Sequence, residues 1–363
     1  MWRVQTLRTA AVWLLFALVA GCGATAPDPP LHDTIAVESP AAIRGLAYHG
    51  MWTSRDAQDR AEILDAIAAA GIPWVRMDVG WTTLQPDGPA QFDPAGVALL
   101  DERLQEVSQR GLRALVMFWW APEWSSGTTD KRGVPSNPQD YARAAAWMVA
   151  RWPTQIAALQ VWNEPNLPEF FASTRPADYA PLLTATYDAV KAVRPDLTVV
   201  TAGPAHMDRG WYRGLYAQGV EESFDALGAH AYPVVGDAPP RVCREDSSGC
   251  DVGWLAEYTR TRGAPAIWVT EMGWSTAPDD DTAPTWQRGV TEAQQARYTA
   301  EMLSWLAKLP RVKAVFVYRD RDFEPVQAHL DGFGVLRADT SPKPVFDVIT
   351  CPSRAACRAD ARQ

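Results

Sequence analysis

Two glutamates stand at the ends of apolar runs in this 363-residue chain, where carboxyl groups can do chemistry. Glu164 directly follows the run Ala158–Asn163, and Glu271 ends the run Ala266–Glu271. Two carboxyl groups that flank one bond can cleave a glycosidic linkage. One protonates the departing oxygen while the other attacks the anomeric carbon or activates water. A single glutamate in such a position is as often a solvent-exposed residue at a strand end as a catalytic one. Two glutamates in matching positions favour catalysis.

Eight strand-like runs recur through the chain, and each is followed by a helical pattern. Most are nearly continuous apolar stretches, which is typical of strands buried on both faces in parallel sheets. The runs are Ile43–His49, Trp74–Trp81, Ala114–Trp120, Ala158–Asn163, Leu197–Ala202, Ala226–Tyr232, Ala266–Glu271 and Ala314–Tyr318.

Amphipathic segments lie between these runs, and the clearest are Asp56–Ala70, Pro94–Arg110, Tyr179–Val193 and Glu292–Lys308. Strands that alternate with helices imply parallel pairing. Eight such units predict an α/β fold of one domain, a closed (β/α)8 TIM barrel over residues 42–350. An open doubly wound sheet is the alternative, but no glycine-rich phosphate loop follows the first run.

The active site of such a barrel forms at the carboxyl ends of its strands. Glu164 ends the fourth strand and Glu271 the seventh, three strands apart around the ring. We therefore expect the two side chains to converge across the mouth of the barrel.

The sequence around both glutamates resembles the signatures of glycoside hydrolase clan A, most closely families 5 and 39. Those segments are Trp162-Asn163-Glu164-Pro165 and Thr270-Glu271-Met272-Gly273-Trp274. The resemblance extends over nearly the whole mature chain. It implies a retaining enzyme without a cofactor, in which Glu164 is the general acid/base and Glu271 the nucleophile. It also implies that Asn163 hydrogen-bonds the sugar 2-hydroxyl.

Further strand ends fit the same resemblance. Arg76 would keep Glu271 ionised, since a nearby cation lowers the pKa of a carboxyl group; an ordinary salt bridge is the alternative. His230 and Tyr232 resemble a His-x-Tyr element of the clan, in which Tyr232 bonds Glu271 and His230 lines the sugar subsite. His49 ends the first strand, where it would reach a sugar hydroxyl.

Aromatic rings are abundant, with 17 tryptophans in the chain. Trp124 and Trp274 follow strand ends, so we expect them to stack on sugar rings, with core packing as the alternative. The eighth strand departs from the clan, because Tyr318–Asp322 carries charges where many members have tryptophan. We expect these charged side chains to bind hydroxyls or an acidic substituent of the sugar substrate.

The N-terminus has the features of an export signal. Arg3 and Arg8 precede the apolar run Ala11–Ala20, which is too short to span a bilayer. Leu18–Cys22 resembles the lipobox of bacterial lipoproteins. We expect a signal peptide at 1–21, a lipidated Cys22 and a Pro-rich tether at 22–41, which place the protein on the extracytoplasmic face of the cell membrane.

The other four cysteines form two local couples, Cys243 with Cys250 and Cys351 with Cys357. An even set in an exported protein suggests disulfides, although the sequence leaves their connectivity open. The second couple lies in a C-terminal tail at 351–363.

Charge and motifs narrow the partners. The net charge of −9 argues against nucleic acid, and neither a His-Glu-x-x-His motif nor clustered histidines point to a metal. We expect a monomer that acts on an extracellular or cell-envelope polysaccharide. A transglycosylase using the same residues and a non-catalytic carbohydrate-binding lipoprotein are the alternatives. The sugar, the linkage and endo or exo cleavage stay open.

Overall fold

The computed structural model describes residues 43–350, apart from 53, 246, 264–265, 279–281 and 283. All of the described residues belong to one compact unit. The predictions for the signal peptide, Cys22, the tether, Cys351 and Cys357 lie outside the described residues.

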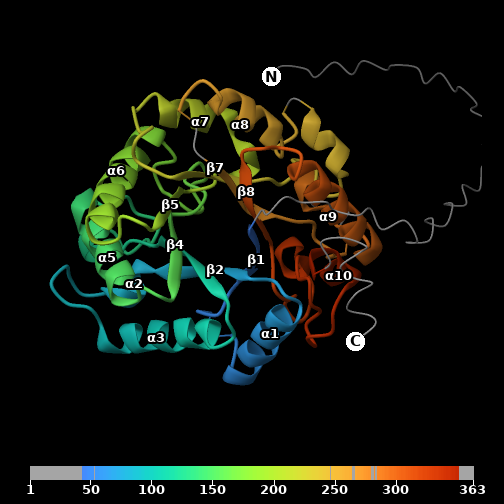
Figure 1. The fold of residues 1–363 in the computed structure, drawn as a ribbon, viewed down its shortest axis with the longest axis horizontal. Helices are drawn as coiled ribbons and strands as arrows, with labels where there is room; N and C mark the ends of the chain where they lie inside the picture. Colours follow the sequence, from blue (N-terminus) through green and yellow to red (C-terminus); the bar gives the residue numbers. More distant parts are fainter. Residues whose placement is uncertain are drawn as a thin grey trace, which may run out of the picture. The chain divides into compact units, whose positions relative to one another are not determined.

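Eight parallel strands close into a barrel in chain order, with β1 paired to β8 (Figure 1). This confirms the predicted (β/α)8 barrel. The strands are β1 (Ile43–Tyr48), β2 (Trp74–Gly80), β3 (Arg113–Trp119), β4 (Ile156–Val161), β5 (Thr198–Thr201), β6 (Ala226–His230), β7 (Ala266–Met272) and β8 (Val312–Val317).

Helices surround the strands in Figure 1. Side-chain caps start several of them: Asp56 accepts from the Asp59 amide, and Thr291 forms a capping box with Gln294. The helices are α1 (Ala57–Ala69), α2 (Trp81–Leu84), α3 (Pro94–Ser108), α4 (Glu123–Ser126), α5 (Pro138–Arg151), α6 (Pro176–Val193), α7 (Arg209–Tyr216), α8 (Val252–Thr259), α9 (Glu292–Leu306) and α10 (Pro344–Thr350). Short 3-10 turns lie at η1 (Ala205–Met207), η2 (Pro240–Arg244), η3 (Thr285–Gln287) and η4 (His329–Gly332).

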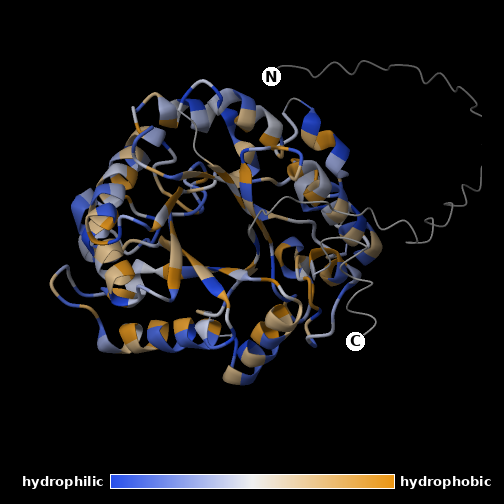
Figure 2. Cartoon of the chain, viewed as in Figure 1, coloured by the Kyte–Doolittle hydropathy of each residue, from blue (hydrophilic) through white to orange (hydrophobic). Residues whose placement is uncertain are grey.

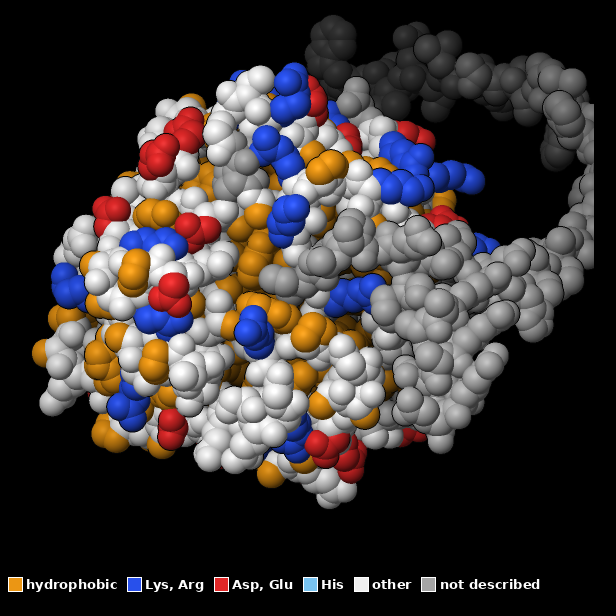
Figure 3. Space-filling model, viewed as in Figure 1, with side chains coloured by type: hydrophobic (Ala, Val, Ile, Leu, Met, Phe, Trp, Pro, Cys, Tyr) orange, Lys and Arg blue, Asp and Glu red, His pale blue; other side chains and the backbone are white. Residues whose placement is uncertain are grey.

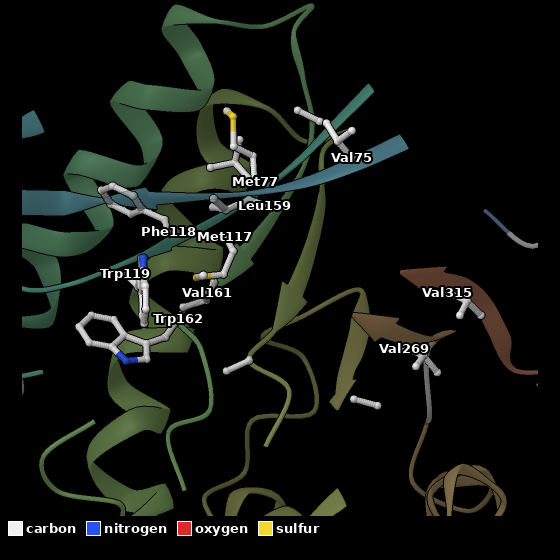
Figure 4. Close-up of a cluster of buried hydrophobic side chains, with 14 of the residues drawn as sticks. Val75, Met77, Met117, Phe118, Trp119, Leu159, Val161, Trp162, Val269 and Val315 are labelled. Carbon is white, nitrogen blue, oxygen red and sulfur yellow. The ribbon is translucent and has the colours of Figure 1, made fainter. Parts of the chain in front are cut away.

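The main hydrophobic core lies between the strands and the helices. Figure 4 shows part of it, where Met77 of β2, Phe118 of β3 and Leu159 of β4 gather. The strands are largely orange in the hydropathy view, whereas the helices alternate between apolar and polar residues (Figure 2). This pattern is the one that strands buried on both faces and amphipathic helices require.

A second, separate apolar cluster comes from the strands alone. It consists of Trp74, Leu115, Ala158, Val200, Ala226, Trp268, Ala314 and Phe316. Because side chains alternate along a strand, the residue two positions after a member points to the same side. On three of the strands that position holds a polar residue: Arg76 on β2, Gln160 on β4 and Thr270 on β7. A polar layer therefore lies next to this apolar cluster, toward the carboxyl ends of the strands.

A disulfide joins Cys243 to Cys250 in the segment between β6 and α8, which confirms this one of the two expected couples. In the same segment the Val234 amide donates to the Ser248 carbonyl over 3.0 Å. The loop after β6 is therefore held by covalent and backbone bonds.

The surface is mixed in character. On the face shown in Figure 3, cationic and anionic side chains are interspersed rather than gathered by sign. Among the described residues, no helix has both the length and the apolar character that crossing a membrane requires.

Candidate active site

The structure brings Glu164 and Glu271 together at the carboxyl ends of β4 and β7. Both glutamates are buried, each with 8% of its surface exposed. One oxygen of each carboxylate and one ring nitrogen of His230 all lie within 4.8 Å of one another. Two carboxyl groups this close face one small reaction space.

Glu271 is held by two donors. Nη1 of Arg76 donates to Oε1 over 2.5 Å, and the Tyr232 hydroxyl donates to Oε2 over 2.9 Å. Burial acts to raise the pKa of Glu271, but the charges of His230 and Arg76 and the bonds from Tyr232 and Arg76 outweigh it. The pKa of Glu271 therefore lies below its usual value, so this carboxylate is ionised.

Arg76 also binds two other side chains across the barrel. Its Nε donates to Gln160 Oε1 and its Nη2 to Asn163 Oδ1, each over 2.7 Å. Gln160 in turn donates to the Thr270 hydroxyl over 3.1 Å. Gln160 was missed in the sequence, where the available signal was one polar residue inside the apolar run of β4.

His230 differs from the expectation that it lines the sugar subsite. It is fully buried, and its Nδ1 lies 2.8 Å from Oε1 of Glu164, with Nε2 3.6 Å from Oε1 of Glu271. The ring fits because residue 203 is glycine: a Cβ there would lie 2.3 Å from the His230 ring. His230 therefore contacts both Glu164 and Glu271 from within the fold, where it presents no surface to a sugar.

The backbone turns sharply after β4. Trp162 has φ 70° and Glu164 has φ 39°, both in the left-handed region. A non-glycine residue there costs about 1–3 kcal/mol and persists only where its surroundings hold it. The Trp162 amide donates to the Phe118 carbonyl over 2.9 Å, and its indole donates to the Phe170 carbonyl over 2.9 Å. These bonds hold the turn that presents Asn163 and Glu164.

A second polar group lies at the ends of β1 and β2. The Nδ1 atom of His49 lies 3.0 Å from Oδ1 of Asp78, and the Trp52 indole donates to Oδ2 over 2.9 Å. Burial acts to raise the pKa of Asp78, but the bonds and charge of His49 and the Trp52 bond lower it below its usual value. Asp78 therefore holds the His49 ring in place through Nδ1. Nε2 of His49 has no hydrogen-bond partner among the described residues.

The two tryptophans singled out in the sequence take different places. Trp274 is 1% exposed, and its indole donates to the Ala238 carbonyl over 2.9 Å, so it presents no face to a sugar. We assign it to packing, contrary to expectation. Trp124 is partly exposed, and its indole donates to the Gln85 carbonyl over 2.8 Å.

The charges after β8 also differ from expectation, because they bind other parts of the fold. Arg319 and Asp320 are fully buried. The ion pairs are Asp320 with Arg55 at 2.8 Å, Arg321 with Asp59 at 2.6 Å, and Asp322 with Lys343 at 2.7 Å. We therefore remove Asp320, Arg321 and Asp322 from the residues expected to contact the substrate.

Solved structures share this fold. A family 39 glycoside hydrolase from Bacteroides cellulosilyticus WH2 is 22% identical with a TM-score of 0.66, over 88% of this chain and 64% of that one. A GH5_18 protein from Streptomyces cattleya, solved with Manβ1-4GlcNAc, is 18% identical with a TM-score of 0.68. The match covers 89% of this chain and 82% of that one. A monomeric β-xylosidase from Caulobacter crescentus CB15 is 19% identical with a TM-score of 0.64. The match covers 87% of this chain and 69% of that one. The chain thus spans slightly less than two thirds of the first of these.

No curated protein matches the chain. The model of the cellulase family, glycosyl hydrolase family 5, matches residues 35–308, which is well over half of the chain. This match agrees with the clan A resemblance seen at Glu164 and Glu271. The chain therefore belongs to glycosyl hydrolase family 5.

Proposed function

We propose that this protein is a retaining glycoside hydrolase that cleaves O-glycosidic bonds of an extracellular or cell-envelope polysaccharide. The proposal rests on one observation: oxygens of Glu164 and Glu271 lie within 4.8 Å of each other. Retaining enzymes hold their two carboxyl groups about 5–5.5 Å apart, whereas inverting enzymes leave about 6.5–9.5 Å for a water molecule.

In the first half of the reaction, ionised Glu271 attacks the anomeric carbon. Glu164 gives its proton to the glycosidic oxygen as the bond from carbon to oxygen breaks, and the glycosyl group is left as an ester on Glu271. In the second half, Glu164 takes a proton from water, the water oxygen bonds to the anomeric carbon, and the ester bond breaks. Glu271 leaves as a carboxylate, and both residues return to their starting states.

The surrounding side chains have distinct tasks in this scheme. Arg76 and Tyr232 orient Glu271 and keep it ionised. Because Oδ1 of Asn163 accepts from Arg76, its amide N–H groups are left to donate to the sugar 2-hydroxyl. Nε2 of His49, which has no partner among the described residues, hydrogen-bonds another sugar hydroxyl. His230 is a positioning residue, whose Nδ1 hydrogen-bonds Glu164.

The stereochemistry of the product tests this mechanism. We expect the sugar released to keep the anomeric configuration of the substrate, as seen by proton NMR in the first minutes of hydrolysis, before mutarotation. A panel of β-1,4-linked gluco-, manno- and xylo-oligosaccharides with matching aryl glycosides is a practical start. It includes the substrate types in the names of a β-xylosidase and an exo-β-1,4-mannosidase of similar fold. Inverted product would rule out Glu271 as a nucleophile.

We also propose that Cys22 carries lipid and anchors the enzyme to the extracytoplasmic face of a bacterial membrane. The support is the export signal with its lipobox-like Leu18–Cys22. We expect Cys22→Ser to move the protein from the membrane fraction to the soluble fraction without changing the kcat/KM of the exported enzyme. Membrane retention of the variant would contradict the anchor.

A further inference from the structure

The exposed apolar side chains of the described part are concentrated on one sector of the barrel. The large ones are Val193, Val234, Trp286 and Leu330, and all but Val193 lie on loops that follow β6, β7 and β8. Those loops leave the carboxyl ends of the strands, on the same side as Glu164 and Glu271. Trp286 is the one aromatic residue among them, with 43% of its surface exposed. An exposed indole on the same side of the barrel as the two glutamates is a candidate for ligand contact.

The backbone that carries Trp286 is held in place. Trp286 lies in the turn η3, where the Thr285 carbonyl accepts from the Gly236 amide over 3.0 Å. The two segments are so close that a Cβ at Gly236 would lie 2.5 Å from the Trp286 carbonyl oxygen. Gly236 lies in the same β6–α8 segment as the Cys243–Cys250 disulfide, seven residues before Cys243. Trp286 is therefore presented by a braced turn, which lowers the entropy lost on binding.

A line of ring contacts connects Trp286 to the nucleophile. Tyr232 donates to Glu271, and its ring centroid lies 5.8 Å from that of Phe333. Phe333 lies 4.9 Å from His329, and His329 lies 5.6 Å from Trp286. Trp286 is thus at the exposed end of a series of ring contacts that passes through buried Phe333 and begins at Tyr232, the partner of Glu271.

The surroundings of Trp286 suit a sugar. The C–H faces of a pyranose ring are apolar and its hydroxyls project from the edge, so a flat indole covers the face while polar neighbours bind the rim. Thr285 and Gln287 flank Trp286, and both have exposed surface. Trp286, Leu330 and Val234 present a single ring and two aliphatic side chains, which match one sugar unit better than a protein partner or a lipid surface.

We propose that Trp286 is the stacking platform of a distal sugar subsite. This inference rests on the proposed glycoside hydrolase activity and deepens it. The substrate is then a chain of several sugar units, with one unit on Trp286 while another occupies the space between Glu164 and Glu271. The enzyme gains affinity from chain length, which a site for a disaccharide alone does not.

The test compares substrates of different length. For the glycan type that the wild-type enzyme cleaves, kcat/KM is measured on an aryl monoglycoside and on oligosaccharides of two to six units. We expect the ratio of long-chain to aryl kcat/KM to fall about three- to tenfold in Trp286→Ala, the size of one stacking contact. Trp286→Phe keeps a flat ring and should retain most of the ratio.

Val193→Ala is the matched control. It removes exposed apolar surface at the end of α6, which leads into the start of β5 at the opposite end of the barrel. This variant should leave the ratio unchanged, and thermal unfolding of all variants checks that each one folds. An unchanged ratio in a folded Trp286→Ala enzyme overturns the subsite. Failure of the wild-type enzyme to cleave any glycan in the panel overturns the proposed function, and the subsite with it.

Discussion

We expect Glu271→Gln to lower kcat/KM by at least about 10⁴-fold on every substrate that the wild-type enzyme cleaves. Glutamine has nearly the same shape but no negative charge, so no glycosyl ester forms. Removing a nucleophile that acts in one unit with its partners costs about as much as removing the whole unit. Glycan affinity, measured by calorimetry with the substrate found in the panel, should be largely retained because the pocket is unchanged.

The pH profile gives a second measurement on the same residue. Glu271 must be ionised to attack, and Arg76 helps to hold its pKa below the usual value. Activity should therefore persist as the pH is lowered and be lost only as it falls through that depressed pKa. Arg76→Met removes the cation, so the pKa of Glu271 rises and the acid limb of kcat/KM should move to higher pH.

Two results would contradict these assignments. Glu271→Gln with wild-type turnover would show that another group is the nucleophile. An acid limb that stays in place in Arg76→Met would show that Arg76 does not control the ionisation of Glu271. Glu169→Gln is a suitable control, since Glu169 is an exposed carboxylate in the loop after β4.

We expect Glu164→Gln to separate substrates by their leaving groups. On a natural glycan, whose leaving oxygen needs a proton, kcat/KM should fall by about 10²–10⁴-fold, the usual contribution of general acid catalysis. On an aryl glycoside with a nitrophenolate leaving group, formation of the glycosyl ester needs little protonation. The second step still needs a base, so the ester on Glu271 should accumulate and appear as a burst of nitrophenol.

Azide provides the decisive addition to this experiment. It is a nucleophile that needs no base, so it should restore turnover of the aryl glycoside by Glu164→Gln and release a glycosyl azide of retained configuration. The Glu271→Gln enzyme forms no glycosyl ester, so azide cannot produce a glycosyl azide of retained configuration with this variant. Equal losses on good and poor leaving groups, without an azide effect, would mean that Glu164 is not the acid/base.

The fold and the two glutamates were accessible from the sequence because they depend on local patterns. Eight apolar runs alternating with amphipathic segments specify parallel β/α units, and the structure has them in that order. A residue at the end of such a run necessarily lies at the barrel mouth, which places Glu164 and Glu271 without knowledge of their contacts. The Cys243–Cys250 couple was accessible for the same reason, since a short loop brings the two cysteines together.

Side-chain partners across the barrel required the tertiary structure. His230 lies beside Glu164, 66 residues away, and Gln160 meets Arg76, 84 residues away. No local pattern encodes such distances, because strand register and barrel closure together decide which inward side chains meet. The side chain of a strand-end residue points either toward the open end of the barrel or into the packed interior of the fold. That choice turned on how the loops pack, and it placed Trp274 and the charges after β8 inside the fold rather than on the substrate.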